Sequence, residues 1–289
     1  MSVMSGRMGE TTGSAVAAPD WSSEVRTAAM VWRRELIRFV RTRVRILTGL
    51  TQPLLFLFVL GYGMSSLIGV TGGFDFKKFV FPGIVAMSVV TTAIFSAVSI
   101  VWDREFGFLR EMLVAPVSRG ALVIGKAAGG STVAAAQGTI MLALAPLIGV
   151  HLTVGVVMAV IGTELLMAVA LTSFGVFVAS RISRMESFQV VMQLVLFPML
   201  FLSGAMFPLN GLPGWLAFFT RINPLTYAVD PLRHIVFAAQ SMPAAARARF
   251  PVGVELFGHV LPIGAELGIV ALFAAGFLGA AIATFGRPD

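Results

Sequence analysis

One segment of the chain has the residue spacing of a phosphate-binding loop. Gly120, Gly125 and Lys126 fit the pattern GxxxxGK, in which loop amides and a lysine hold the phosphates of a nucleotide. Ala127 follows the lysine, although the pattern needs a Ser or Thr there to hold magnesium. The residues between Gly120 and Gly125 are apolar, and no soluble strand precedes them. We therefore expect this segment to bind no phosphate.

Other residues that carry catalysis or hold metals are scarce. The chain contains no cysteine, and its histidines, His151, His234 and His259, lack the spacing of metal ligands. No nucleophile has a base in a plausible sequence context. We therefore expect no catalytic, metal-binding or cofactor-binding residue, and we do not expect the chain to be an enzyme on its own.

The composition indicates a membrane protein. Of the 289 residues, 57% are hydrophobic and 12% are charged, whereas a soluble domain has about 25% charged residues. Several stretches without charge reach the length of about 20 apolar residues that a helical span needs. They are too long and continuous for barrel strands, and every amide in hydrocarbon needs an internal partner. The predicted fold class is therefore an all-α integral membrane protein.

We expect six transmembrane helices within a single transmembrane domain over residues 20–289, after a disordered cytoplasmic tail over 1–19. Apolar residues and arginines over 20–44 recur at helical spacing, which predicts an N-terminal amphipathic helix along the membrane interface; a solvated helix packing on a partner is the alternative. The predicted spans are 45–68, 79–102, 126–148, 152–180, 188–207 and 257–285. The apolar pieces within 208–256 are too short to cross, which predicts an outer re-entrant helical segment before the last span.

Basic residues are unevenly divided between the two sides of this layout. Most of the 21 Lys and Arg residues fall on the side of the N-terminus. The opposite side has Lys77, Lys78, Arg221, Arg233, Arg247 and Arg249. Because basic residues favour the cytoplasmic side, both termini should be cytoplasmic, and the net charge of +7 needs no nucleic-acid partner. Trp102 then falls at the inner interface, and Tyr62, Trp215 and Tyr227 fall at the outer one.

The predicted cytoplasmic loop over 102–125 interleaves charged and apolar residues. Pro116 should end a short helix, and Ser118 can cap the helix that follows. Such a helix would pass movement from a soluble partner to the membrane helices, whereas a solvated loop that only connects two spans is the alternative. Gly125 and Gly129, at the start of the third span, permit a neighbouring helix to approach closely.

Two separate stretches carry a family resemblance. They are FPGIVAMSVVTTAIFSAVSIVWDREFGFLREMLVAPVSRGALVIGKAAGG, residues 81–130, and LSGAMFPLNGLPGWLAFFTRINPLTYAVDPLR, residues 202–233. The first resembles the second span and following loop of type-2 ABC exporter permeases, in particular the daunorubicin-resistance and nodulation-exporter branch. The second is similar to the outer segment before the last span of that family. With the six-span layout, the resemblance covers about residues 25–285.

The resemblance implies a membrane subunit that pairs with a second permease copy and recruits two copies of a separate ATPase subunit, which would itself bind ATP and magnesium. In that family, the helix before the first span and the loop after the second contact the ATPase. The matching residues are Arg33, Arg34, Arg38, Trp102, Asp103, Arg104, Glu105, Phe106, Arg110, Glu111 and Arg119. The outer re-entrant lid of the family matches Pro208, Pro213, Trp215, Asn223, Pro224, Tyr227, Asp230 and Arg233.

On this resemblance we expect an exporter in the bacterial plasma (inner) membrane that uses ATP hydrolysis to move lipophilic drugs, antibiotics or lipids out of the cytoplasm or inner leaflet. An exporter of polysaccharide or glycoconjugates is the alternative, although two Tyr and four Trp offer few rings to stack on sugars. A proton-coupled secondary transporter is a further alternative. It predicts inverted internal repeats, and we detect none in the sequence.

Gln137, Glu164 and Glu266 are ionisable or amide side chains inside predicted spans, where such groups are costly and thus informative. Gln137 and Glu164 lie near the middle of the third and fourth spans, so an antiparallel hairpin brings them to similar depth. We favour a structural hydrogen bond between them; a polar contact in the translocation path or a proton site is the alternative. Glu266, nearer the outer end of the sixth span, should contact the re-entrant segment or water.

Overall fold

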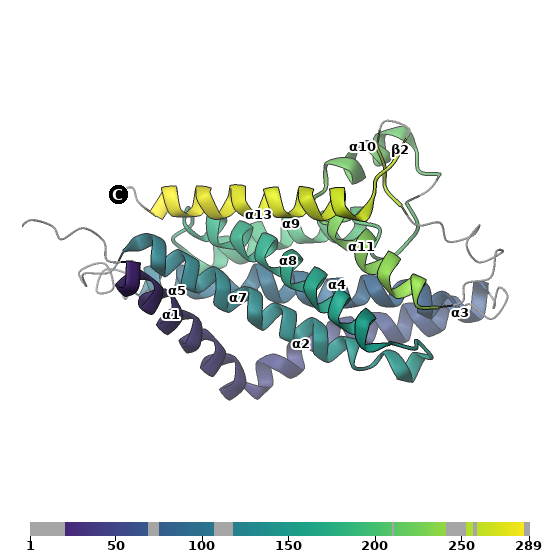
Figure 1. Ribbon diagram of the computed structural model, residues 1–289, viewed down its shortest axis with the longest axis horizontal. Coiled ribbons are helices and arrows are strands. Elements are labelled where there is room, and N and C mark those ends of the chain that lie inside the picture. Colours follow the sequence, from purple (N-terminus) through teal and green to yellow (C-terminus); the bar gives the residue numbers. More distant parts are fainter. Residues whose placement is uncertain are drawn as a thin grey trace, which may run out of the picture.

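Long helices run side by side in one bundle; the first described helix begins, and the last one ends, at the same end of it (Figure 1). The structure is a computed structural model that describes residues 21–68, 75–106, 118–209, 211–240, 253–256 and 259–285. Within these ranges six helices are long and apolar enough to cross a membrane, which confirms the predicted fold class. They cover Ile46–Ser66, Phe76–Glu105, Arg119–Ile148, Val154–Ala179, Met185–Leu202 and Ile263–Phe285.

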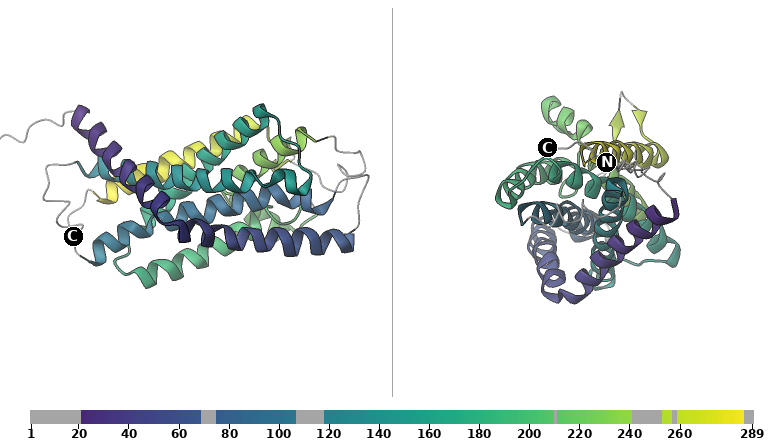
Figure 2. Two further views of the ribbon diagram at one scale, coloured as in Figure 1. Left: turned by 90° about the horizontal axis from the view of Figure 1, so that it is seen from below. Right: turned by 90° about the vertical axis from the view of Figure 1, so that its left-hand side faces the viewer.

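The two ends of the bundle differ in what they contain (Figure 1). We call the end with Phe106 and Ser118 the loop end, because the connection between the second and third spans leaves and re-enters the bundle there. We call the end with Asp75 and Asn223 the cap end, because two short helices cover it. Figure 2 shows the same bundle from a second side and along its length.

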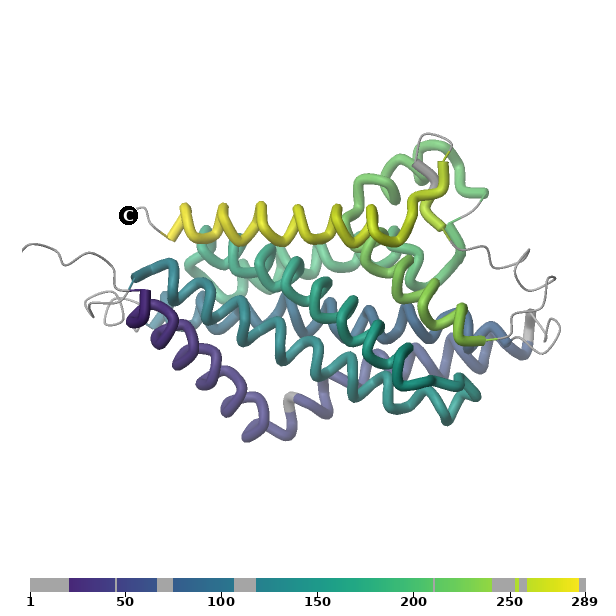
Figure 3. Tube along the Cα trace, in the orientation of Figure 1, coloured from purple at the N-terminus to yellow at the C-terminus, as the bar shows by residue number. Residues whose placement is uncertain are grey.

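The N-terminal helix is separate from the first span. α1 (Trp21–Arg41) ends at Thr42, whose hydroxyl donates to the Arg38 carbonyl at 2.9 Å, and α2 (Arg43–Phe56) leaves in a new direction (Figure 3). α1 runs obliquely across α7 (Arg119–Leu142) instead of along the bundle (Figure 1). Several of its apolar side chains are exposed: Trp21, Val25, Met30, Ile37 and Val40. Such a face suits a membrane interface, and the placement of α1 at the interface stays a prediction.

Two glycines let α1 pack directly on α7. A Cβ atom at Gly125 would lie 2.7 Å from the carbonyl oxygen of Ala28, and one at Gly129 would lie 2.8 Å from Cβ of Glu35. Any side chain at these positions would push α1 away from α7. The predicted close approach at Gly125 and Gly129 is confirmed, and the helix that approaches is α1.

The first span is irregular along its length. α2 contains Pro53, which has no amide hydrogen to donate, and a π-helical stretch, Leu57–Tyr62, follows α2 directly. The span then ends in α3 (Gly63–Ile68). Phe58 and Val59 are exposed on this stretch, so the first span presents apolar side chains to the outside of the chain.

α4 (Phe76–Ser96) forms the core of the bundle. It packs against α2, α7, α8 (Val154–Ala179) and α11 (Thr226–Ala238), and most of its side chains are fully buried. A helix that is apolar on all sides is stable only when neighbours surround it. After Ala97 the chain continues as α5 (Val98–Glu105) to the loop end.

The third span starts earlier than expected. The hydroxyl of Ser118 accepts a hydrogen bond from the Ala121 amide at 3.1 Å, so the helix is capped there and α7 begins at Arg119. It is followed by a 3₁₀ turn, Ala145–Ile148, and Gly149 then turns the chain towards α8 with a φ of 74°. The predicted cap at Ser118 is confirmed.

The remaining elements complete the cap end. α9 (Met185–Leu202) is followed by α10 (Gly214–Ile222), which lies on the outside of the bundle (Figure 1). The two-residue strands β1 (Glu255–Leu256) and β2 (His259–Val260) pair antiparallel before the last span. Since this hairpin uses extended backbone, α13 (Ile263–Phe285) begins later than the expected start of the sixth span. α11 packs between α4, α8 and α13, and the re-entrant path of this segment stays a prediction.

We expect Gly83→Val to destabilise the fold strongly. Gly83 of α4 meets the backbone of the segment after α9, and a Cβ atom there would lie 1.7 Å from the Ala205 carbonyl oxygen. Overpacking costs about 1–3 kcal/mol, and rigid backbone leaves this site at the upper end. Thermal unfolding of the detergent-solubilised protein measures the loss. Gly162→Ala on α8 is the control, because nothing lies within 4 Å of its Cβ position; equal midpoints for both variants would contradict the packing.

Candidate functional site

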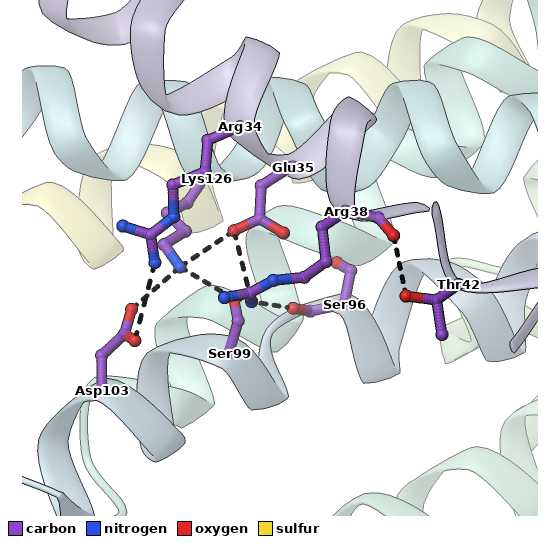
Figure 4. A network of polar contacts seen from close by, with 8 residues as sticks. All are labelled: Arg34, Glu35, Arg38, Thr42, Ser96, Ser99, Asp103 and Lys126. Carbon is purple, nitrogen blue, oxygen red and sulfur yellow. Dashed lines mark hydrogen bonds and ion pairs between the residues drawn. The ribbon is translucent and has the colours of Figure 1, made fainter. Parts of the chain in front are cut away.

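A charged network at the loop end connects three elements (Figure 4). Nζ of Lys126, on α7, lies 3.1 Å from Oε1 of Glu35 on α1 and 3.0 Å from Oδ2 of Asp103 on α5. It also donates to the hydroxyl of Ser99 on α5 at 2.9 Å. An ammonium group has three hydrogens, and here each one has an acceptor.

This arrangement explains how a lysine can be buried among apolar helices. The side chain of Lys126 is 8% exposed, that of Asp103 is 8% exposed and that of Glu35 is 11% exposed. A buried charge is tolerated only when it is paired and its remaining hydrogens have acceptors. Because the acceptors lie on α1 and α5, Lys126 requires both to stay against α7.

Two arginines extend the network towards its rim. Nη2 of Arg34 lies 3.8 Å from Oδ1 of Asp103, and Nη1 of Arg38 lies 3.9 Å from Oε1 of Glu35. The side chains of Arg34 and Arg38 are 49% and 43% exposed. Long contacts from exposed arginines stabilise a fold little. These arginines therefore add positive charge more than rigidity.

The structure gives the GxxxxGK segment a different role from nucleotide binding. Gly120, Gly125 and Lys126 all lie within the continuous helix α7, whereas a phosphate-binding loop needs non-helical backbone before its helix. The lysine is occupied by carboxylates from α1 and α5. Sequence reasoning missed Glu35 and Ser99 and considered Lys126 only as part of the loop pattern. The available signal was a lysine at the start of an apolar span, which needs a partner carboxylate.

Three other predicted contact residues hold helix ends together at the loop end. Arg104 of α5 donates to the Ser180 carbonyl after α8 at 2.8 Å, and Arg119 of α7 donates to the Phe285 carbonyl at the end of α13 at 3.0 Å. The carboxylate of Glu105 accepts a hydrogen bond from the amide of Met185, the first residue of α9, at 3.0 Å.

The predicted ATPase-contact residues therefore divide into two groups. Asp103 is buried in the network, while Arg33, Trp102 and Phe106 are exposed. The rings of Trp102 and Phe106 lie 5.0 Å apart and form a small aromatic surface. Arg110 and Glu111 lie outside the described residues.

Gln137 and Glu164 do not bond to each other among the described residues. Nε2 of Gln137 donates to the Ile46 carbonyl on α2 at 3.1 Å, whereas Oε2 of Glu164 accepts from the Thr139 hydroxyl at 3.4 Å. Residues 137 and 139 point to nearly opposite sides of α7, because each helical residue turns the chain by about 100°. The expected hydrogen bond was therefore assigned to the wrong face of α7.

Side chains of the predicted lid anchor the cap to the end of α9. Asn223 donates to the Met199 carbonyl at 2.7 Å, whereas the Thr226 hydroxyl donates to the Thr220 carbonyl at 2.8 Å and lies 3.3 Å from the Leu202 carbonyl. Arg233 is buried, donates to the Gly204 carbonyl and stacks over the ring of Phe79, 4.3 Å from its centre. Burial lowers the pKa of Arg233 to about 10, so the guanidinium is still charged at neutral pH.

A second group of polar side chains lies beneath the cap. The carboxylate of Asp230 accepts from the Gly253 amide at 3.2 Å and lies 3.1 Å from Nδ1 of His234. The hydrogen bond that His234 donates to the Asp230 carboxylate raises the pKa of His234 above its usual range. Glu266, on the first turn of α13, is fully buried beside this pair. The structure therefore places Glu266 against the re-entrant segment.

The remaining lid residues are spread between the surface and the interior. Pro213 and Trp215 are exposed on α10, whereas Pro208 and Pro224 are partly buried. Tyr227 is 5% exposed and its hydroxyl donates to the Arg221 carbonyl at 2.6 Å. The expected place of Tyr227 in an outer aromatic belt is therefore wrong, because its ring packs inside the cap.

We expect Lys126→Met to destabilise the protein by about 3–5 kcal/mol, because it leaves Glu35 and Asp103 buried without their shared cation. Chemical unfolding in detergent measures the loss. Arg41→Gln, at the exposed end of α1, is the control and should change stability by less than about 0.5 kcal/mol. If Lys126→Met unfolds at the wild-type denaturant concentration, the network does not hold α1 in place.

Comparison with known proteins places this geometry in a family. The family described as ABC-2 type transporter matches residues 27–237. Nodulation protein J of Rhizobium meliloti (strain 1021) is 32% identical over 212 residues, which cover 72% of this chain and 80% of that protein. The putative transport permease ycf38 of Cyanophora paradoxa is 29% identical over 213 residues, covering 70% and 71%. The inner membrane transport permease YadH of Escherichia coli (strain K12) is 28% identical over 219 residues, covering 74% and 84%.

The match spans α1, the first five membrane helices and nearly all of the cap, so it includes both the charged network and the anchors of α11. Such a family subunit associates with an ABC ATPase subunit. The chain belongs to the ABC-2 type transporter family and is a multi-pass membrane permease subunit of an ABC transporter.

Proposed function

We propose that this chain is the permease of an exporter in a bacterial plasma membrane, paired with a second permease copy and driven by two copies of a separate ATPase subunit. It would move lipophilic drugs, antibiotics or lipids out of the cytoplasm or inner leaflet. The ATPase, and not this chain, would bind ATP and magnesium. The observation that carries the proposal is the charged network that joins α1, α5 and α7 within the region matched by the family.

The proposal places the loop end in the cytoplasm. Basic side chains are concentrated there, on α1 and at the start of α2, and basic residues favour the cytoplasmic side of a bilayer. Among the described residues, the basic side chains of the cap end are Lys77, Lys78, Arg221 and Arg233. This orientation puts the exposed surface of Arg33, Trp102 and Phe106 on the side where an ATPase subunit would bind.

Mechanical work would enter the bundle through this surface. A push on α1 would reach α5 and α7 through Lys126, whose three hydrogen bonds prevent the elements from sliding independently. From α5 the movement would pass to α9 through Glu105 and to α8 through Arg104. Closure of the ATPase subunits would thereby shift whole helices against one another, a common form of conformational switching.

The two alternatives have less support. Family membership favours ATP-driven transport over coupling to a proton gradient. Polysaccharide transport calls for rings that stack on sugars, and the structure removes Tyr227 from the available aromatic side chains by burying it.

Reconstitution with the ATPase tests the proposal. The purified complex in proteoliposomes should hydrolyse ATP faster when lipophilic compounds are added, and it should move them only while ATP is hydrolysed. Dissipating the proton gradient should leave transport unchanged, because no proton drives it. Transport that persists without ATP hydrolysis and stops when the gradient is collapsed would contradict the proposal.

The bond between Glu105 and α9 provides a test of the coupling route. Glu105→Lys should reduce transport per ATP hydrolysed, because it places a cation where the α9 amide needs an acceptor. Transport and ATP hydrolysis are measured together in the assembled complex. Glu186→Lys is the matched control, since Glu186 is also an exposed carboxylate at the start of α9. Unchanged transport per ATP hydrolysed in the Glu105 variant would contradict this coupling route.

A further inference from the structure

A hollow lies beside the charged network at the loop end. Arg38 of α1, Phe95 of α4 and three residues of α5, namely Val98, Ser99 and Trp102, line it, and its volume is about 570 Å³. Sites for small molecules usually have volumes of about 300–1,000 Å³. Trp102 is 48% exposed, so the hollow is accessible from outside the chain.

The lining is amphipathic. Phe95, Val98 and Trp102 provide an apolar wall, while Arg38 provides the hydrogen-bond donors. The hydroxyl of Ser99 already donates to the Ser96 carbonyl at 3.2 Å and accepts from Lys126. A guanidinium group has five N–H donors in a planar fork, which suits carboxylate and phosphate groups. A ligand that matches this lining has an apolar body and one acidic head.

The charges of the network point to the same class of ligand. Three cations, Lys126, Arg34 and Arg38, share the carboxylates of Glu35 and Asp103. Lys126 has the short contacts to both carboxylates, at 3.1 and 3.0 Å, whereas Arg38 is 3.9 Å from Glu35. The group of five side chains thus carries one positive charge in excess, and Arg38, at the hollow, has the looser pairing.

We propose that this hollow binds an anionic amphiphile as cargo, with the head on Arg38 and the tail along Phe95, Val98 and Trp102. The inference deepens the proposed function by naming the charge of the lipophilic substrate, and it rests on that function. The hollow lies near the loop end of the second span, where the proposed orientation puts the inner-leaflet interface. An amphiphile in that leaflet would reach it with its head at the depth of the phosphates.

Ligand binding in this hollow would act on the charged network directly. Glu35 contacts both Arg38 and Lys126 through the same oxygen, Oε1. An acidic head that pairs with Arg38 would leave Glu35 to Lys126 alone. The contact of α1 with α7 would then strengthen when cargo is present.

The test measures binding by the chain without the ATPase, in nanodiscs of phosphatidylcholine. Three probes with the same brominated tail are compared: the anion dodecanoate, the cationic trimethylammonium compound and the neutral alcohol. Each probe quenches tryptophan fluorescence, and the contribution of Trp102 is the difference in quenching between the wild type and Trp102→Phe. We expect the anion to half-saturate the site at a concentration at least about tenfold below that of the cation, which corresponds to about 1.4 kcal/mol. Equal half-saturation by anion and cation would overturn the proposal.

Variants separate the roles of charge and space. Arg38→Gln should abolish the preference for the anion, whereas Arg43→Gln, an exposed arginine on the first turn of α2, should keep it. Val98→Phe retains every charge of the network, adds no tryptophan and should weaken quenching of Trp102 by taking up space in the hollow. Retained anion preference in Arg38→Gln, or unchanged quenching in Val98→Phe, would overturn the site.

A second arm distinguishes cargo from a resident lipid. Brominated dodecanoate should stimulate ATP hydrolysis by the assembled complex, and Arg38→Gln should lower this stimulation relative to the stimulation by neutral lipophilic compounds in the same variant. Displacement of the probe by phosphatidylglycerol, without any stimulation by the probe, would assign the hollow to a lipid headgroup and overturn the cargo assignment. Export of neutral compounds without anion binding would overturn this inference alone and leave the proposed function standing.

Discussion

The burial of one ammonium group constrains the loop end of this protein. Lys126 can stay charged among apolar helices only while Glu35, Ser99 and Asp103 surround it, and those residues belong to α1 and α5. The small residues of α7 make this possible, because Gly125, directly before the lysine, lets α1 come close enough for Glu35 to reach it. Packing and charge therefore depend on each other: without the close approach the lysine has no full set of acceptors, and without the lysine two carboxylates repel across the interface.

The cap end is held by a different kind of interaction. The last carbonyls of a helix have no partner within it, and side chains of the cap supply donors to α9 and the residues that follow it, at Met199 and Gly204. The first amide of α9 is bonded to Glu105 of α5 at the loop end. α9 is thus tied at one end to α5, which contributes to the charged network, and at the other end to α11 and the residues before it, which makes it one physical link between the two ends of the bundle.

The proposed ligand site and the charged network share one carboxylate, that of Glu35. Glu35 contacts Lys126, which holds α1 to α7, and Arg38, which lines the hollow beside Trp102. A ligand that competes for Arg38 changes the electrostatic surroundings of Lys126 without touching it. Arg38, which would bind the acidic head, therefore contacts the same Glu35 that holds α1 to α7 through Lys126.

Local properties of the sequence determined the membrane helices, the helix start at Ser118 and the close approach at Gly125. The hydropathy of a span is a property of consecutive residues, and a capping residue or a glycine affects the backbone within a few residues of itself. Each of these features can therefore be inferred without knowing the rest of the chain. The partners of polar side chains could not be inferred in this way. Glu35 and Lys126 are 91 residues apart in the sequence. Gln137 bonds to α2 while Thr139 bonds to Glu164, because these two positions point to nearly opposite sides of α7. Only the packing of α1, α5 and α8 around α7 decided which buried charge met which acceptor, since a buried polar group bonds to whatever lies across its own face of the helix.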